Sequence, residues 1–387
     1  MRRFLAVVAL ALLGPIAAAQ TPGLPPAGTL DGLGVNIHFT HPRDGEMKML
    51  ADAGFKWVRM DFAWSAIEKT KGKYDFSDYE SLLKALDQHH MRAILILDYS
   101  NRMYDDGQSP HTDAGREAFS KWAAASAAHF KGRGVIWEMY NEPNIKFWKP
   151  KPNVDDYAKL ALAVGKAIRQ AAPDELYVGP ATSLIDMKFL EACFKAGCLQ
   201  YWDAVSVHPY RQKAPETVVP EYQKLRALID QYAPSGKKIP ILSGEWGYSS
   251  SWRNFDESRQ GQYLPRELLT NVASGVLVSI WYDWHDDGQD PKEAEHHFGT
   301  VHFPYRPDQA QVYEPKPAYE AMKTLTSELL GMTFSKRIPG KSDADWILLF
   351  HGPAGDKLVA WTTDKDHEVT VEGKAVMLSG TPKYWNK

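Results

Sequence analysis

Two glutamates stand at the ends of short apolar runs. Glu142 lies in Asn141-Glu142-Pro143, after the run 135–140, and Glu245 follows the run 239–243. Two carboxylates facing one cleft suit cleavage of a glycosidic bond: a protonated one donates to the leaving oxygen, and an ionised one attacks the sugar or activates water. Pro143 predicts an extended backbone at Glu142, which would help to aim the side chain. The alternative is that both are surface acids at helix starts, where the helix dipole favours negative charge.

The elements that must position these acids alternate along the chain. Nearly continuous apolar runs are typical of parallel strands covered on both faces, and amphipathic segments lie between them. The predicted strands are Gly34–Phe39, Trp57–Asp61, Arg92–Asp98, Val135–Tyr140, Leu176–Gly179, Ala204–His208, Ile239–Ser243 and Val276–Asp283. The helical segments include Glu46–Ala53, Tyr79–His89, Gly115–His129, Val154–Ala171 and Pro220–Tyr232.

Eight such strands with intervening helices predict an α/β fold, a (β/α)8 TIM barrel, over residues 20–331. Reactive groups of this fold lie at the carboxyl ends of the strands, so Glu142 and Glu245 should face each other across the barrel mouth. No G-x-G-x-x-G follows the first strand, which argues against a dinucleotide site. Residues 332–387 contain short strand-like runs between Gly, Pro and Asp, and predict a small C-terminal antiparallel β module packed on the barrel.

The first residues predict export. Met1-Arg2-Arg3, an apolar run and Ala17-Ala18-Ala19 are typical of a signal peptide over residues 1–19, which indicates a secreted or periplasmic protein. The alternative, a membrane anchor, needs about 20 apolar residues. We expect no membrane span elsewhere in the chain. Cys193 and Cys198 could form a disulfide after export or remain buried thiols.

Composition narrows the possible partners. The 387 residues carry 45 Lys plus Arg against 48 Asp plus Glu, a net charge of −3 without long runs of one sign. That balance argues against nucleic acid and against a polybasic membrane patch. The 13 Trp, 18 Tyr and 15 Phe supply flat rings that fill a core or stack on sugars. The stretch 285–297 is rich in His and Asp but lacks the ligand order of known metal motifs, so we expect no catalytic metal and no cofactor.

Asn141-Glu142-Pro143 after the fourth strand, together with Glu245 at the end of the seventh, resembles the clan of retaining β-glycosidases built on (β/α)8 barrels (clan A). Further stretches are similar to glycoside hydrolase family thirty-nine and its endoglycosidase relatives, although families five and fifty-one share several of them. These stretches are Trp64…Ile67-Glu68, Gly72-Lys73-Tyr74-Asp75, Trp281-Tyr282-Asp283-Trp284 and Lys316-Pro317-Ala318-Tyr319.

The resemblance implies a double displacement, with Glu142 as general acid/base and Glu245 as the nucleophile that forms a covalent glycosyl-enzyme. It implies that Asn141 hydrogen-bonds the 2-hydroxyl of the sugar and that Arg59 keeps the nucleophile ionised. An adjacent guanidinium has that effect because it favours the charged carboxylate. The alternative for Arg59 is a structural ion pair with Asp61 or another strand-end acid.

The resemblance also implies that Tyr210 hydrogen-bonds the nucleophile, that His208 lies in the sugar site and that Trp281 floors the subsite of the cleaved sugar. His208 and Tyr210 could instead be core residues. Asn36 and His38 share one face of the first strand, where sugar hydroxyls are candidate partners. A second group of residues either contacts sugar or has a structural role in packing or capping: Trp284, Trp246, Trp148, Trp252 and Asp98.

We therefore expect a secreted retaining β-glycoside hydrolase that acts on a β-linked oligo- or polysaccharide. A non-catalytic carbohydrate-binding barrel is the rival from another class, and a transglycosylase would use the same residues. The sequence leaves open the sugar and linkage, internal against terminal cleavage, and the oligomeric state.

Overall fold

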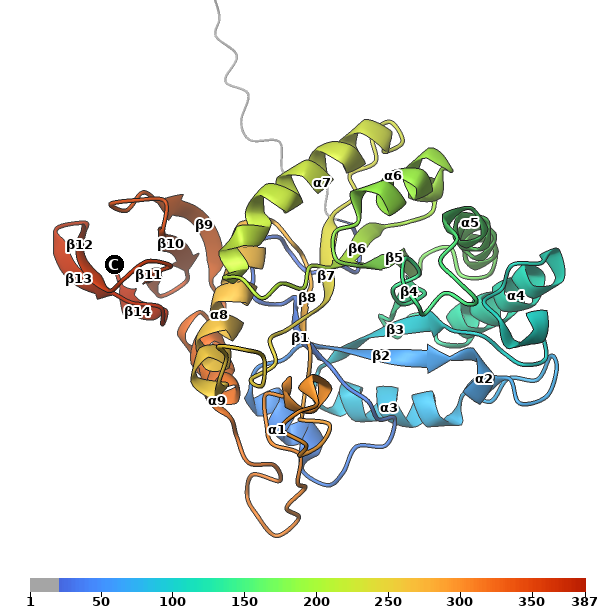
Figure 1. The fold of residues 1–387 in the computed structure, drawn as a ribbon, viewed down its shortest axis with the longest axis horizontal. Helices are drawn as coiled ribbons and strands as arrows, with labels where there is room; N and C mark the ends of the chain where they lie inside the picture. Colours follow the sequence, from blue (N-terminus) through green and yellow to red (C-terminus); the bar gives the residue numbers. More distant parts are fainter. Residues whose placement is uncertain (1–20) are drawn as a thin grey trace, which may run out of the picture.

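The computed structural model describes residues 21–387, so the predicted signal peptide lies outside the described residues. Eight parallel strands close into a barrel in sequence order (Figure 1). Each overlaps a predicted strand, although the eighth is far shorter than the predicted Val276–Asp283. The strands are β1 (Leu33–Asn36), β2 (Trp57–Ala63), β3 (Arg92–Asp98), β4 (Ile136–Met139), β5 (Leu176–Ser183), β6 (Ala204–His208), β7 (Ile241–Trp246) and β8 (Ser279–Trp281).

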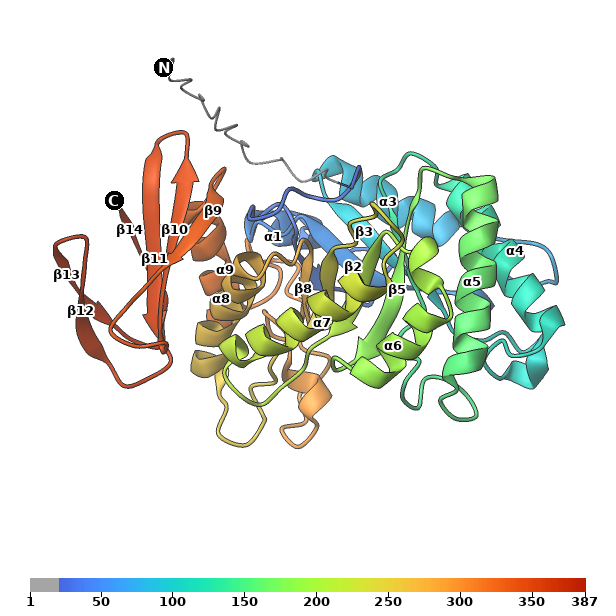
Figure 2. The ribbon, with the colours of Figure 1, turned by 90° about the horizontal axis from the view of Figure 1, so that it is seen from above.

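Helices surround the barrel (Figures 1 and 2). Val154–Ala171 is helical over the predicted range, and its start is fixed by Asn153, whose side chain accepts from the backbone N–H groups of Asp155 and Asp156. The helices are α1 (Glu46–Asp52), α2 (Trp64–Ile67), α3 (Ser77–Gln88), α4 (Asp113–His129), α5 (Val154–Ala171), α6 (Met187–Lys195), α7 (Val219–Tyr232), α8 (Glu257–Ala273) and α9 (Pro317–Glu328). Short 3-10 helices are η1 (Asp105–Gly107), η2 (Cys198–Gln200), η3 (Pro215–Val218) and η4 (Ala294–His297). No helix within residues 21–387 has both the length and the apolar character needed to cross a bilayer.

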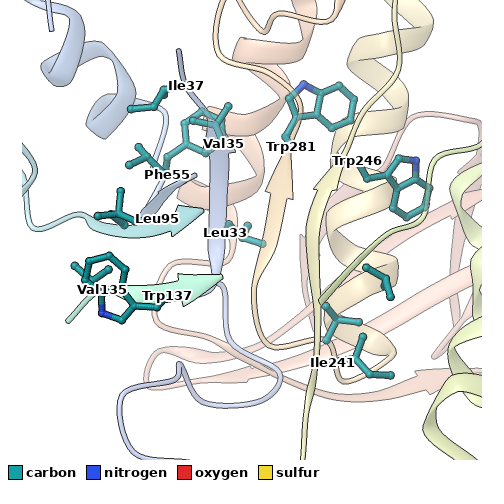
Figure 3. Packing of buried hydrophobic residues seen from close by; sticks show 14 of the residues in the cluster. Leu33, Val35, Ile37, Phe55, Leu95, Val135, Trp137, Ile241, Trp246 and Trp281 are labelled. Atoms are coloured by element: carbon teal, nitrogen blue, oxygen red, sulfur yellow. The ribbon is translucent and has the colours of Figure 1, made fainter. Parts of the chain in front are cut away.

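Two apolar layers hold the barrel together. One fills its interior and includes Ile136, Val278 and Ile280. The other, larger layer lies between strands and helices, and Figure 3 shows part of it, including Trp137 and Trp281. Alternate residues of one strand thus enter different layers, and both layers are apolar, as expected of a covered parallel sheet.

The predicted C-terminal antiparallel module is confirmed as two small sheets beside α8 and α9, on the side of the barrel away from α4 (Figures 1 and 2). Four strands pair in the order β14-β11-β10-β9, and β12 pairs with β13. The strands are β9 (Thr333–Ile338), β10 (Asp345–Gly352), β11 (Gly355–Thr362), β12 (His367–Val371), β13 (Lys374–Leu378) and β14 (Lys383–Asn386).

Buried polar contacts tie the module to the barrel. Trp361 Nε1 in β11 donates to Glu216 Oε1 at 2.6 Å, and the same carboxylate accepts two hydrogen bonds from Arg266 in α8, at 2.7 and 2.9 Å. Because all three side chains are buried, these contacts join the module firmly to the barrel. Cys193 and Cys198 do not form a disulfide in this structure. Both are free, buried thiols, the second of the two alternatives.

Candidate active site

A cleft of about 630 Å³ opens at the carboxyl ends of the barrel strands. Seven of the predicted site residues line this cleft, and they lie in five strands or just after them. They are Asn36, His38, Arg59, Asn141, Glu142, Tyr210 and Glu245.

The two carboxylates lie close together in this cleft. One oxygen of Glu142, one of Glu245 and a ring nitrogen of His208 lie within 4.8 Å of one another. Retaining glycosidases hold their two carboxyl groups about 5–5.5 Å apart, whereas inverting enzymes leave about 6.5–9.5 Å for a water molecule. Oxygens of Glu142 and Glu245 that lie within 4.8 Å of each other fit the shorter of these separations.

The local backbone at Glu142 differs from the expectation. Instead of an extended conformation before Pro143, Glu142 has a φ of 44°, in the left-handed region. Its backbone N–H donates to Ala181 O at 2.9 Å, so the end of β5 holds the turn in place. The proline preference is local, and this contact between neighbouring strand ends overrides it.

Arg59 is the centre of the polar network under the cleft. Its guanidinium, 1% exposed, donates from Nη1 to Glu245 Oε2 at 2.7 Å and from Nη2 to Asn141 Oδ1 at 2.8 Å. Its Nε donates to Glu138 Oε2 at 2.6 Å. Burial alone would lower the pKa of Arg59, but the carboxylates of Glu138 and Glu245 outweigh burial and raise it, so the side chain remains a cation.

Tyr210 holds the other oxygen of Glu245. Its hydroxyl donates to Glu245 Oε1 at 2.9 Å. Burial, followed by the charge of Glu245, raises the pKa of Tyr210 well above its ordinary value, so the phenol keeps its proton and remains a donor. Both oxygens of Glu245 are thus held by hydrogen-bond donors.

His208 lies beneath the site and is not among the residues that line the cleft, so the implied sugar contact is not found. Its Nε2 is 3.2 Å from Arg59 Nη2, and its Nδ1 is 3.1 Å from Glu142 Oε1. Because a guanidinium can only donate, Nε2 must accept. The neutral ring therefore carries its proton on Nδ1 and donates it to Glu142.

Trp281 does not line the base of the cleft, contrary to the expectation. Its side chain is fully buried in the layer between strands and helices, and its Nε1 donates to Phe298 O at 3.3 Å (Figure 3). Val278 and Ile280 point into the barrel, so by strand alternation the next inward residue is Tyr282. Tyr282 lines the cleft and takes the place that the sequence prediction gave to Trp281.

Three further tryptophans proposed for subsites are also buried: Trp284, Trp246 and Trp148. Trp284 donates from Nε1 to Glu46 Oε1 at 3.0 Å, away from the cleft. Trp252 alone of this predicted group lines the cleft, where its ring meets that of Phe298 at 5.2 Å.

Asp98 is also absent from the cleft lining, so a sugar contact is not found for it. Its carboxyl group is fully buried below the mouth. Burial, and then the neighbouring charge of Asp61, raise its pKa well above the ordinary value. Asp61, predicted only as a possible ion-pair partner of Arg59, lines the cleft where Asp98 does not.

His38 forms an ion pair at the edge of the cleft. Its Nε2 lies 3.4 Å from Asp283 Oδ2 and 3.5 Å from Asn36 Nδ2. Burial alone would lower the pKa of His38, but Asp283 outweighs it and raises the pKa to about 9. Burial raises the pKa of Asp283 to about 7. The first strand and the loop after β8 thus meet through this pair.

Several cleft residues lie after the barrel strands and were not predicted as site residues. Glu295, in η4, lines the cleft with Tyr282 and Phe298. Burial, and then the charge of Glu245, raise the pKa of Glu295. In the segments that follow β3 and β4, Tyr99 and Phe147 stack at 5.7 Å and also line the cleft. Aromatic rings therefore stand on both sides of the carboxylates.

Within residues 21–387, two side-chain groups have donors spaced closely enough for a metal ion. They are Glu142 with His208 and Glu245, and His38 with Asp283 and Asp287. In the first group the donors already contact Arg59, Tyr210 and each other. Those contacts suit acid–base and nucleophilic chemistry.

A closed (β/α)8 barrel with two carboxylates at this separation defines a class of enzyme, the glycoside hydrolases that act with retention. The family model described as cellulase (glycosyl hydrolase family 5) matches residues 33–288, about two thirds of the chain. The chain belongs to this family and is a glycoside hydrolase. The resemblance to clan A is thereby confirmed.

Solved structures share the fold. A family 39 glycoside hydrolase from the gut symbiont Bacteroides cellulosilyticus WH2 has a TM-score of 0.78 at 23% identity, over 94% of this chain and 81% of that one. A family 39 β-xylosidase from Caulobacter crescentus has a TM-score of 0.65 at 20% identity, over 89% and 81%. A family 30 endoxylanase from Clostridium papyrosolvens C71 has a TM-score of 0.61 at 13% identity, over 90% and 85%. No curated protein sequence matches the chain.

Proposed function

We propose that the protein is an exported hydrolase that cleaves a β-linked oligo- or polysaccharide by double displacement, with Glu245 as nucleophile and Glu142 as general acid/base. The observation that carries the proposal is the approach of the two carboxylates within 4.8 Å, with Arg59 and Tyr210 holding only one of them, Glu245. The two acids thus have different environments, as unlike roles require.

In the first step Glu245 attacks the anomeric carbon while Glu142 gives its proton to the leaving oxygen. The glycosidic bond breaks, and a covalent glycosyl-enzyme forms on Glu245. His208 occupies Glu142 Oε1 as a donor, which leaves Oε2 to carry the transferred proton. In the second step Glu142 takes a proton from water, the water oxygen attacks the anomeric carbon, and Glu245 leaves as a carboxylate.

Asn141 is proposed to bind the sugar hydroxyl next to the reacting carbon. Its Oδ1 accepts from Arg59 at 2.8 Å, which fixes the amide orientation and leaves Nδ2 to donate to the 2-hydroxyl. The aromatic pairs Tyr99–Phe147 and Trp252–Phe298 lie on two sides of the cleft. Such rings suit the apolar faces of sugar units on either side of the cleaved bond.

Export is proposed from residues 1–19 alone. Expression of the full chain with its own first residues in a secreting bacterium should give a mature N-terminus at Gln20. A protein that retains Met1 would contradict export by this route.

The function is tested with a panel of aryl β-glycosides and polysaccharides, starting with β-xylosides and β-glucosides. The anomer released first is identified by proton NMR, and the β-anomer is expected. The Glu245→Gln and Glu142→Gln variants should lose most turnover. Glu117→Gln, an exposed glutamate of α4, makes the same chemical change away from the cleft and should behave as wild type.

Net inversion, or turnover in Glu245→Gln close to that of wild type, would contradict the proposal. Products longer than the substrate in the presence of acceptor sugars would instead identify a transglycosylase that uses the same residues.

A further inference from the structure

A third glutamate lies directly beneath the reacting pair. Glu138, in β4, is fully buried, and its Oε2 accepts from Arg59 Nε at 2.6 Å. Arg59 therefore bridges two carboxylates, Glu138 in the barrel interior and Glu245 in the cleft. Of these three side chains, only that of Glu245 is partly exposed to solvent. The hydrolytic steps described above leave Glu138 without a role.

The interior is shaped around Glu138. Ser206 Oγ, in β6, donates to Glu138 Oε1 at 2.5 Å. A side chain at Gly244, the residue before Glu245, would place its Cβ 2.4 Å from Ser206 Oγ and 2.9 Å from Glu138 Oε1. Position 244 must therefore stay without a side chain for the Glu138–Ser206 pair to fit beside the strand that carries Glu245.

The geometry of the guanidinium connects Glu138 to the cleft. A guanidinium is planar, with donors in fixed directions. When Nε is held at Glu138, the plane is set, and Nη1 and Nη2 point to Glu245 and Asn141 at 2.7 and 2.8 Å. A rotation that broke the Nε contact would also displace the hydrogen bonds to Glu245 and Asn141.

Charge gives Glu138 a second effect. With Glu138 ionised, the single positive charge of Arg59 is shared between two carboxylates. Without that second negative charge, Arg59 would act on Glu245 alone and hold its electron pair more tightly. A carboxylate held in this way is a weaker nucleophile but a better leaving group.

We propose that Glu138 is a positioning residue of the reaction, which orients Arg59 toward Glu245 and Asn141 and limits the pull of Arg59 on the nucleophile. This inference rests on the proposed role of Glu245. The alternative is a purely structural ion pair that joins β2 to β4. The two differ in their effect on the pH profile, because a structural pair changes stability without changing the ionisation of the nucleophile.

Other charged or titratable groups also face Glu245 and contribute to that profile. They are Arg59 and Asp61 from β2, Glu142 after β4, His208 and Tyr210 from the end of β6, and Tyr282 and Glu295 after β8. All of them remain in the variants below, so a difference between variant and wild type reports the substituted residue.

The decisive variant is Glu138→Gln, which removes the charge and keeps the size, with an amide oxygen still able to accept from Arg59 Nε. The acid limb of the kcat/KM profile reports ionisation of the nucleophile, and loss of one partly shielded negative charge nearby makes that ionisation easier. We therefore expect the acid limb to move to lower pH by about one pH unit. We expect kcat at neutral pH to fall about tenfold, with KM changed less than about twofold. Ser206→Ala, which keeps both charges, should leave the acid limb at its wild-type position.

An acid limb in Glu138→Gln that coincides with that of wild type would overturn the inference. Should Glu138→Gln fail to fold, Glu138→Asp decides, because it keeps the charge and withdraws the carboxylate from Arg59. That variant should lose kcat with the acid limb unmoved, and wild-type kcat would refute the positioning role. Wild-type activity and its loss in Glu245→Gln are measured in the same series, so failure of the proposed function is seen separately.

Discussion

Replacement of Tyr210 by phenylalanine removes one hydroxyl group from the nucleophile and keeps the ring. The hydroxyl donates to Glu245 Oε1 at 2.9 Å, and a hydrogen bond to a charged group contributes about 1.5–3 kcal/mol. Since each 1.4 kcal/mol is about a tenfold change in rate, kcat should fall between about 10-fold and about 150-fold. Arg59 still holds the other oxygen, so the loss should be smaller than that of Glu245→Gln.

The step affected distinguishes this account from a general loss of structure. In the second half of the reaction Glu245 departs as a carboxylate, which Tyr210 stabilises, so hydrolysis of the glycosyl-enzyme should slow most. Stopped-flow measurement with an activated aryl glycoside should show a burst of about one aryl group per enzyme, followed by slow turnover and a lower KM.

Tyr177→Phe is the matched control, because its buried hydroxyl donates at 2.9 Å to Ala161 O, away from the cleft. It should lose stability and keep wild-type kcat. Turnover of Tyr210→Phe within twofold of wild type would refute the assignment of Tyr210 to the nucleophile.

Three further outcomes are expected. Arg59→Lys should lower kcat/KM at least about 100-fold, because an ammonium group cannot reproduce the directed hydrogen bonds of the guanidinium to Glu138, Glu245 and Asn141; steady-state kinetics checks this. The pKa of His38 is raised to about 9 by Asp283 against the opposing effect of burial, so its contribution to stability is fully present below about pH 6.5 and is lost as the pH rises through about 9. Melting temperatures of wild type and His38→Gln should therefore converge above pH 9, and a constant difference would contradict this. Trp361→Phe, which loses the 2.6 Å hydrogen bond to Glu216, should lower the free energy of unfolding by about 1–3 kcal/mol, as measured by urea denaturation.

The sequence was sufficient to predict the barrel because its strands are continuous apolar runs and its helices are amphipathic. It was also sufficient to locate Glu142 and Glu245, because parallel strands bring their carboxyl ends to one rim. The inward direction of side chains was harder to predict. Both faces of each strand are buried, so hydrophobicity does not distinguish the residues that point inward from those that point outward.

Trp281 and Tyr282 illustrate this limit. The residues are adjacent and both are aromatic, and the structure was needed to show that Tyr282 lines the cleft, in agreement with the inward positions of Val278 and Ile280. Glu295 was missed for another reason: it lies in the short 3-10 helix η4 between β8 and α9, and the path of this connection depends on tertiary contacts that have no periodic pattern. The φ of 44° at Glu142 likewise follows from a contact with Ala181, which no local rule contains.

The most direct test of the central claim is covalent trapping of the nucleophile. Incubation with an activated 2-deoxy-2-fluoro β-glycoside of the preferred sugar should inactivate the enzyme and add one sugar mass. Peptide mass spectrometry should locate that sugar on Glu245, and Glu245→Gln should remain unlabelled. A label on another carboxylate, or continued turnover without any covalent species, would contradict the account.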